Sequence, residues 1–512
     1  MGDYAIEMLE ITKIFPGIIA NDDVTFRVKK GEIHALAGEN AAGKSTLMNV
    51  LFGIYEADKG EIRINGKAVR IKNPLDARKL GIGMVHQNFR LIDAFTVLEN
   101  IILGEESTAS GFLNKNKARE KVLELSKKYG FEIDLDEKVE NISVAMKQKT
   151  EILKMLYRNN DILIFDEPTA VLAPDETDKL LETLKSLRSE GKTVVFISHR
   201  LNEIMSVADR VTVLRKGRCV GTFETKSITK KKLSSLMVGR EVELKVKKSK
   251  AKVGEVVLKA ENISVPSTFN KRKLAVKDIS FEVRRGEILA VAGVEGNGQR
   301  ELADAVTGMG RIKSGRLFIC GKEASKMSVR SRNEAFLCHI PEERLRHGLV
   351  GGFSIRDNLI LKSYKDKEFQ RFGFIKKVNA NAYAEKLIND YAINSAHGAD
   401  TLTETMSGGN QQKAVIAREF DKDLPLVVAV QVAKGLDVGV CEYIYKKLIE
   451  KRDKGCAVLL VSFDLDEVMN VADRIIVMRQ GVISGEFLTE KTSVKELALA
   501  MTDSVGKGEE LE

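Results

Sequence analysis

An internal repeat constrains this chain more than any other feature. The segment that begins at Gly31 (GEIHALAG) returns at Gly286 as GEILAVAG, an offset of 255 positions. Two later landmarks, IS at position 197 and ADR at position 208, return as VS at 461 and ADR at 472, an offset of 264. Because the landmarks recur in the same order, the chain is a tandem duplication. The second copy holds nine more residues between its landmarks than the first.

Each copy alternates strand-like and helix-like segments. Short apolar runs at 33–37, 162–165 and 194–197 are typical of buried parallel strands. Helix-patterned stretches such as 117–129 and 179–189 lie between such runs. This alternation predicts an α/β fold with a parallel sheet covered on both faces. We expect a first domain at 1–240, a solvated Lys-rich linker at 241–255 and a second domain at 256–505.

The composition excludes several other kinds of protein. With 43% hydrophobic and 30% charged residues in 512, the chain is not a disordered tail, a collagen-like repeat or a disulfide scaffold. No apolar stretch approaches the ~18 to 20 residues that span a bilayer, and we expect no signal peptide. Five widely separated cysteines indicate thiols of a reducing compartment. A net charge of +9 is small for this length, so we expect no nucleic-acid partner.

A phosphate-binding loop is predicted in the first copy. Residues 38–45 (GENAAGKS) fit the pattern G-x-x-x-x-G-K-[ST] between a strand-like and a helix-like run, a context that disfavours a fortuitous glycine turn. Backbone N–H groups of such a loop bind phosphates, Lys44 adds a positive charge and the Ser45 hydroxyl can ligate Mg²⁺. The predicted ATP-binding residues here are Gly38, Glu39, Asn40, Ala41, Ala42, Gly43, Lys44, Ser45 and Thr46.

Two carboxylates follow a later apolar strand of the same copy. Asp166 and Glu167 end the run DILIFDE that starts at Asp161. Such a pair alone is usually a solvated strand end, but after a phosphate-binding loop it indicates a nucleotide site. We expect Asp166 to hold Mg²⁺ through water and Glu167 to polarise the attacking water.

Further motifs make the chain resemble the ABC ATPases over nearly its whole length. Residues 407–412 (SGGNQQ) are similar to the family signature, Gln87 to its glutamine loop and His199 to its switch histidine. Phe15 lies where the family stacks an aromatic ring on adenine, although a core aromatic is the alternative.

The resemblance implies two tandem P-loop ABC ATPase domains, each with a RecA-like parallel-sheet core and a helical subdomain. It implies ATP and Mg²⁺ as ligands. The implied catalytic residues are Glu167, His199 and Gln87, the implied metal ligands are Ser45, Gln87 and Asp166, and the implied ATP contacts of the signature are Ser407, Gly408, Gly409 and Asn410.

The second copy lacks the catalytic residues of the first. The two offsets place Gln299 and Arg300 at the positions of Lys44 and Ser45. The other replacements are Val430 for Asp166, Gln431 for Glu167, Phe463 for His199 and, if the offset of 255 still holds there, Glu342 for Gln87. An intact catalytic site is therefore predicted in the first copy only.

The signatures show the opposite pattern, since residues 142–146 of the first copy read ISVAM. In ABC proteins two domains pair head to tail, and each nucleotide lies between one P-loop and the opposite signature. The resemblance therefore implies one hydrolytic site, built from the first P-loop and the second signature. The remaining pair of degenerate motifs would at most hold nucleotide.

Three departures from the family pattern are visible. Ala41 stands in the strong site where the family usually has glycine, and its methyl could crowd the phosphates and change the ATP affinity if the backbone needs a positive φ. We expect a negative φ there and a tolerated substitution. Ala145 and the segment 430–434 also depart from the pattern, but they belong to the weak site.

Among ABC proteins, the asymmetric tandem resembles the fused ATPase subunits of bacterial sugar and nucleoside importers. The stretches 81–89 and 96–104 look most similar to the nucleoside branch, which works with a basic-membrane-protein lipoprotein. The implied partners are two integral membrane permeases and an extracytoplasmic substrate-binding lipoprotein, and the implied location is peripheral, at the cytoplasmic face of the cell membrane. The rival is a soluble tandem ABC ATPase acting on ribosomes, which usually keeps two intact sites and a long charged linker. A DNA-repair ABC protein would carry zinc-type cysteine clusters.

Overall fold

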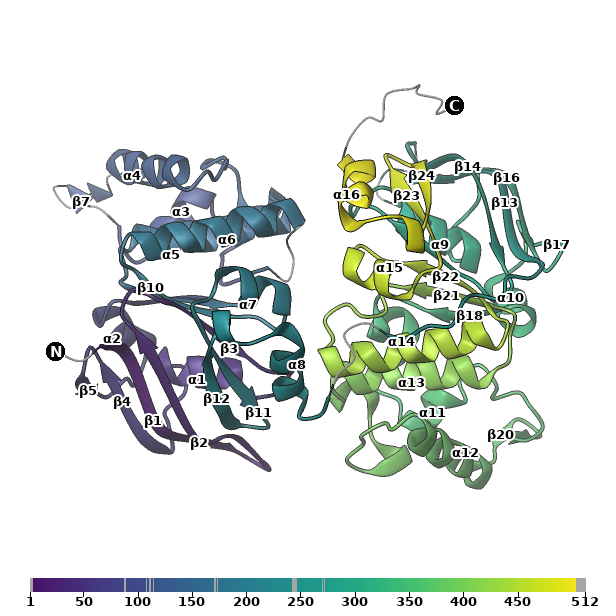
Figure 1. Cartoon of the computed structure of the whole chain (residues 1–512), viewed down its shortest axis with the longest axis horizontal. Helices are drawn as coiled ribbons and strands as arrows, with labels where there is room; N and C mark the ends of the chain where they lie inside the picture. Colours follow the sequence, from purple (N-terminus) through teal and green to yellow (C-terminus); the bar gives the residue numbers. More distant parts are fainter. Residues whose placement is uncertain are drawn as a thin grey trace. The chain divides into compact units, whose positions relative to one another are not determined.

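The chain folds into two units, one for each copy of the repeat. The structure is a computed structural model that describes residues 3–86, 89–106, 108–109, 112–113, 115–169, 172, 174–241, 246–268, 270 and 272–502. Contacts divide it into Met1–Val242 and Glu243–Glu512, which Figure 1 colours from purple to teal and from teal to yellow.

The first unit has a six-stranded core sheet. Its order is β12 (Arg218–Glu224), β11 (Arg210–Arg215), β3 (Ile33–Ala37), β10 (Thr193–Ile197), β9 (Ile162–Asp166) and β6 (Ile82–Val85). Only the edge strand β12 is antiparallel to its neighbour. Every residue of β3, β9 and β10 is buried, because the sheet is covered on both faces. These strands confirm the predicted parallel sheet.

A second sheet of the first unit is antiparallel, which the repeat and the motifs did not predict. Its order is β2 (Ile18–Lys29), β1 (Tyr4–Phe15), β4 (Lys59–Ile64) and β5 (Lys67–Val69). One face of this sheet packs with Leu36 of β3 and Leu47 of α1 (Lys44–Leu51) in a shared core. The antiparallel sheet therefore covers the same face of the core sheet as α1, the helix that follows the phosphate-binding loop.

Helices complete the first unit. Three of them, α3 (Val97–Ile102), α4 (Lys115–Lys128) and α5 (Val144–Tyr157), pack together on one side of the unit, away from β1 and β2 (Figure 1). The others are α2 (Pro74–Lys79), α6 (Pro174–Ser189), α7 (Leu201–Val207) and α8 (Lys230–Val238). The group of α3, α4 and α5 matches the expected helical subdomain.

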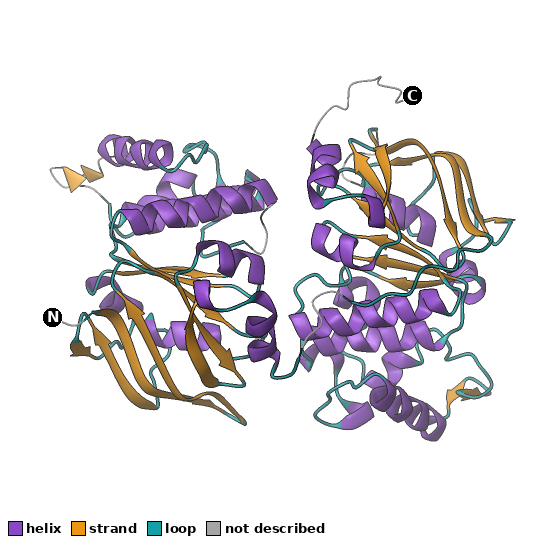
Figure 2. Ribbon diagram, viewed as in Figure 1, coloured by secondary structure: helices purple, strands orange, loops and turns teal. Residues whose placement is uncertain are grey.

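The second unit repeats both sheets (Figure 2). Its core sheet has the order β18 (Leu337–Ile340), β21 (Leu426–Val430), β22 (Ala457–Val461), β15 (Ile288–Ala292), β23 (Arg474–Arg479) and β24 (Val482–Leu488). Its antiparallel sheet has the order β14 (Leu274–Arg284), β13 (Val256–Pro266), β16 (Ser314–Ile319) and β17 (Lys322–Glu323). Its helices are α9 (Gln299–Thr307), α10 (Val329–Ala335), α11 (Ile355–Leu359), α12 (Lys377–Asp390), α13 (Gly408–Asp421), α14 (Val438–Asp453), α15 (Leu465–Val471) and α16 (Val494–Thr502).

Strand registers settle the correspondence between the copies. Ile82 pairs with Ile162 in the first unit, and Leu337 pairs with Leu426 in the second. The offset of 255 therefore holds as far as β18, and Glu342 corresponds in sequence to Gln87. Gln87 itself lies outside the described residues.

The predicted linker is mostly exposed where the structure describes it, but it also makes specific contacts with the second unit. Val246 is buried in the core of the second unit, and its N–H donates to Asn470 Oδ1 at 2.9 Å. Ser249 O accepts a 2.9 Å hydrogen bond from Arg452. The Lys-rich stretch is therefore largely exposed, as Lys247, Lys250 and Lys252 show, and the buried Val246 and the Ser249 carbonyl attach it to the second unit. Across the described ranges, no helix combines the length and apolarity that crossing a bilayer requires.

Candidate nucleotide site

The phosphate-binding loop of the first unit is shaped by close contact with two strands. A Cβ atom on Gly38 would lie 2.4 Å from Leu214 O, and one on Gly43 would lie 2.3 Å from Ala20 O. Gly43 also has φ 95°, which disfavours other residues. The buried Asn21, which the sequence analysis missed, donates to Gly43 O at 3.1 Å and holds the loop against β2.

Lys44 lies inside the loop rather than in solvent. Its side chain is buried, and Nζ donates to the carbonyl oxygens of Gly38 at 2.9 Å and Glu39 at 2.8 Å. The ammonium group is thus held at the centre of a loop of backbone N–H groups at the N-terminus of α1. A cation and N–H donors in this arrangement fit the phosphates of a nucleotide.

Ser45 and Asp166 supply oxygen ligands beside this cation. The Ser45 hydroxyl donates to Asp166 Oδ1 at 3.3 Å. Burial raises the pKa of Asp166 to about 6, aided by the charge of Glu167 and opposed by Ser45 and Lys44. A hydroxyl and a carboxylate are hard ligands of the kind that Mg²⁺ takes together with water and phosphate oxygens. The two residues therefore fit the predicted metal site.

Glu167 and His199 also lie together, as predicted. His199 Nδ1 is 3.2 Å from Glu167 Oε1, and Glu167 N–H donates to Ile197 O at 3.0 Å. Burial opposes ionisation of Glu167, but the hydrogen bond and charge of His199, with Lys44 and Arg200, lower its pKa overall. An ionised carboxylate held by an imidazole beside the phosphate loop can accept a proton from water.

Phe15 lies at the end of β1, and it is only half-buried. Its ring contacts Tyr55 edge to face, with centroids 5.2 Å apart, and Lys13 Nζ lies 5.5 Å from its centroid. Phe15 is not one of the core residues, contrary to the alternative weighed for it. Its contact with adenine stays a prediction, and its neighbour Tyr55 belongs to no motif of the sequence analysis.

The second unit keeps the shape of the loop but has a glutamine at the position of the phosphate-binding lysine. Gln299 Nε2 donates to Val294 O at 3.2 Å, the carbonyl that corresponds to Glu39 O in the first unit. Gln299 Oε1 is buried, and none of the residues that the structure describes forms a hydrogen bond with it. An uncharged amide thus supports the loop where Lys44 does so in the first unit, and it brings no charge to a phosphate.

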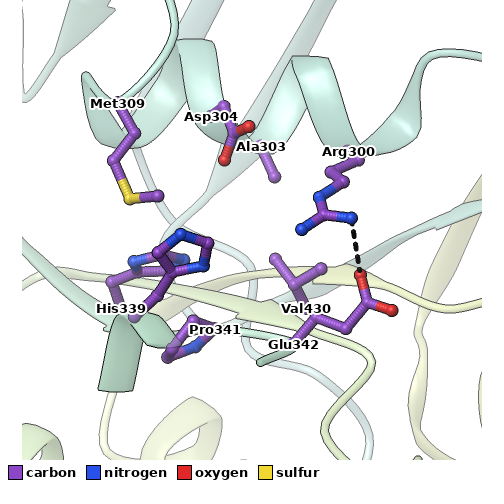
Figure 3. A pocket seen from close by; sticks show the side chains of 9 residues that line it. Arg300, Ala303, Asp304, Met309, His339, Pro341, Glu342 and Val430 are labelled. Atoms are coloured by element: carbon purple, nitrogen blue, oxygen red, sulfur yellow. Dashed lines mark ion pairs between the residues drawn. The ribbon is translucent and has the colours of Figure 1, made fainter. Parts of the chain in front are cut away.

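An arginine lies where the first unit has its metal-ligand serine. Arg300 Nη2 donates to Glu343 Oε1 at 2.9 Å, and Nη1 lies 3.9 Å from Glu342 Oε2. Figure 3 shows Arg300 pointing toward Glu342 across Val430, beside a cavity of about 20 Å³. Because a guanidinium is a fixed cation and Val430 has no oxygen ligand, this arrangement does not fit Mg²⁺.

The two signatures begin their helices in the same way. Ser407 caps α13, and its hydroxyl accepts a hydrogen bond from Asn410 Nδ2 at 3.0 Å. Ser143 caps α5 in the first unit by accepting from Met146 N–H at 3.3 Å. The difference lies in the glycines. A Cβ atom on Gly408 would lie 3.3 Å from Arg344 Nη2, and one on Gly409 would lie 3.0 Å from Val440 Cγ2. Both positions are therefore crowded from within the second unit.

Ala41 contradicts the expected conformation. Its φ is 62°, in the left-handed region, so the predicted negative φ is wrong. The geometry of the loop imposes this conformation, since Gly296, the corresponding residue of the second loop, has φ 91°. An alanine at such a position is strained by about 1 kcal/mol.

Comparison with known proteins gives the same family for both units. The family described as "ABC transporter" matches residues 21–170 and 276–429. The guanosine import ATP-binding protein NupO of Bacillus subtilis is 48% identical over 505 residues, which cover 99% of this chain and 98% of that protein. The nucleoside import ATP-binding protein NupA of Lactococcus lactis is 45% identical over 496 residues, 97% of each chain.

A solved structure of an archaeal complex, ribosomal stalk protein aP1 with the ribosome recycling factor aABCE1, has a TM-score of 0.65 at 18% identity. It covers 96% of this chain and 92% of that chain. At this identity the likeness shows a shared fold alone.

The strain at Ala41 leads to a paired prediction. Ala41→Gly is expected to raise the free energy of unfolding of the first unit by up to about 1 kcal/mol, because glycine accepts a positive φ. Gly296→Ala is expected to lower that of the second unit by a similar amount, since its Cβ would meet open space and only the backbone is strained. Urea unfolding of both variants measures these changes. A stabilising Gly296→Ala would contradict the argument.

The raised pKa of Asp166 predicts that this residue lowers the free energy of unfolding in a pH-dependent way. Between about pH 4 and pH 6 the folded chain holds a proton on Asp166 that the unfolded chain has lost, so stability falls as the pH rises. Asp166→Asn should therefore stabilise the metal-free chain at pH 8 by up to about 3 kcal/mol and leave it unchanged near pH 4. Thermal unfolding at both pH values in EDTA tests this. An equal effect at the two values would reject it.

Proposed function

The chain belongs to the ABC transporter family, and we propose that, as the ATP-hydrolysing subunit of an importer, it powers the uptake of a nucleoside. The observation that carries the enzymatic part is the geometry of the first unit, where Lys44, the pair of Ser45 and Asp166, and the pair of Glu167 and His199 meet at one loop. The nucleoside is proposed because the printed names of the two relatives specify guanosine or nucleoside import.

Each of these residues of the first unit has a different role in the proposed reaction. The loop N–H groups and Lys44 would bind the β- and γ-phosphates of ATP. Ser45 and Asp166, together with Gln87, would hold Mg²⁺, which when bound neutralises charge on the phosphate oxygens. Glu167 would accept a proton from the attacking water, and His199 would keep the Glu167 carboxylate ionised and oriented through the 3.2 Å contact.

The signature of the second unit would complete this site. Ser407 lies at the exposed N-terminus of α13, where its hydroxyl and the following N–H groups are available to a phosphate. The complementary losses in the two copies support this pairing, since each motif that one copy lacks is kept in the other. The degenerate loop around Gln299 would then have no catalytic function.

The proposed assembly follows from the same family. ABC importer ATPases work with membrane permeases, and we propose two such subunits and an extracytoplasmic lipoprotein that binds the solute. The chain would then lie at the cytoplasmic face of the membrane as a peripheral subunit. Uptake of labelled guanosine and of labelled ribose by cells carrying the complete operon, with and without this chain, tests the cargo. Uptake of ribose alone would reject the nucleoside.

The proposed base gives the next prediction. Glu167→Gln should retain ATP and slow hydrolysis by roughly 10² to 10⁴-fold, since a positioned base contributes that much. The amide is nearly the same shape, so binding of ATP should persist. Phosphate release and filter retention of labelled ATP by the full-length chain measure the two effects. Hydrolysis near the parental rate would reject the assignment of Glu167.

The pairing of motifs predicts an unequal effect of one substitution at two signatures. Gly408→Asp should lower hydrolysis by about 10²-fold or more, because it adds a carboxylate beside the bound phosphate and contacts Arg344. Ala145→Asp introduces the same charge into the first signature, at the counterpart of the neighbouring Gly409. It should have a much smaller effect, since the loop it would face has no lysine. If each copy works alone, the ranking reverses, and ATPase rates of the two variants distinguish the cases.

A further inference from the structure

Arg344 lies beside the intact signature and belongs to none of the motifs discussed above. It begins a single π-helical turn, Arg344–Gly348, that follows β18. Its Nη2 lies 3.3 Å from the position of a Cβ on Gly408, and its Nη1 donates to Lys434 O at 3.2 Å. The guanidinium therefore contacts both the signature and the turn after β21.

The π-helical turn is an insertion in the second copy. Asn100 Nδ2 donates to Ile92 O at 3.0 Å, and Asn358 Nδ2 makes the same 3.0 Å bond to Val350 O. These matching residues are 258 positions apart, whereas the offset at β18 is 255. Three of the nine extra residues of the second copy thus lie at this turn. Single π-turns are frequent at functional sites.

The charge of Arg344 is not neutralised within the second unit. Among the described residues, no carboxylate lies within ion-pair distance of its guanidinium. The two carboxylates that precede it in the sequence already form other ion pairs, since Glu342 pairs with Lys434 at 2.6 Å and Glu343 pairs with Arg300 at 2.9 Å. Partial burial lowers the pKa of Arg344, and no anion opposes that effect. A half-buried cation without a counter-charge is stabilised by an anionic ligand.

We propose that Arg344 binds the γ-phosphate of ATP as a part of the second signature. The inference rests on the proposed function, in which Ser407 and Gly408 face the ATP bound at Lys44. Arginine suits this site because its planar fork can donate two parallel hydrogen bonds to phosphate oxygens. The contact with Gly408 places the charge beside the N–H groups that would bind the same phosphate.

The test uses the full-length chain with Glu167→Gln, which is expected to retain ATP. Arg344→Gln is added and the dissociation constants of Mg²⁺-ATP and Mg²⁺-ADP are measured by titration. We expect about a tenfold or larger weakening for ATP and no change for ADP, which has no γ-phosphate. Arg344→Lys keeps the charge without the fork and should restore part of the affinity. Arg346→Gln is the matched control, because Arg346 lies in the same turn with a side chain that is 72% exposed, and it should change neither constant.

Each other result overturns the inference. Unchanged ATP affinity in Arg344→Gln would show that Arg344 does not contact the γ-phosphate. An equal loss of ATP and ADP affinity, or a lower melting temperature, means that Arg344 only supports Gly408 structurally. The same loss in Arg346→Gln means a nonspecific effect of charge. If the Glu167→Gln chain itself binds ATP no better than ADP, or if Gly408→Asp leaves ATP binding intact, the proposed function fails and this inference fails with it.

Discussion

Both nucleotide loops depend on a very close approach of the loop backbone to the neighbouring antiparallel sheet. A Cβ on Gly43 would lie 2.3 Å from Ala20 O, and one on Gly298 would lie 2.2 Å from Ala275 O. No side chain fits at such distances, so the last glycine of the loop is required by packing in both units. This requirement is independent of phosphate chemistry. It explains why the degenerate copy keeps the shape of the loop after losing the lysine and serine that follow the glycine in the first copy.

Outside the loop, too, the second unit has fewer side-chain hydrogen bonds than the first. The buried Glu203 of the first unit accepts 2.8 Å hydrogen bonds from Thr169 and Ser198 and pairs with Arg200 at 3.2 Å. Within the described part of the chain, the side chain of the corresponding Glu467 bonds only to Ser462, and its Oε1 has no partner. Burial raises the pKa of Glu467 to about 8, so this carboxyl is largely neutral at pH 7. The polar network that joins the segment after β9 to α7 in the catalytic unit is therefore reduced in its copy.

The sequence was sufficient for features that local patterns or the repeat determine. Buried runs predicted the core strands, and the repeat predicted which residues of the two copies correspond, as the equivalent pairs Val194–Ile33 and Val458–Ile288 show. The antiparallel sheet was missed because β1 and β2 are only partly buried, so that buried and exposed residues alternate along them instead of forming continuous apolar runs. The sign of φ at Ala41 follows from closure of the loop around Lys44, which outweighs the preference of alanine. Catalytic roles, the signature pairing and Gln87 remain predictions.

The linker makes contacts that its composition does not predict, although most of its described residues are exposed. Each unit has an Arg–Asp ion pair at the same place: Arg188 with Asp209 at 2.8 Å, and Arg452 with Asp473 at 2.7 Å. The Arg188 side chain is 48% exposed, whereas that of Arg452 is fully buried, because Ser249 and its neighbours cover it. Lysine-rich segments are usually solvated, but here the carbonyl of Ser249 satisfies a guanidinium N–H that would otherwise need water. The segment thus adds to the second unit, and the difference between the two ion pairs arises from the order of the copies along the chain.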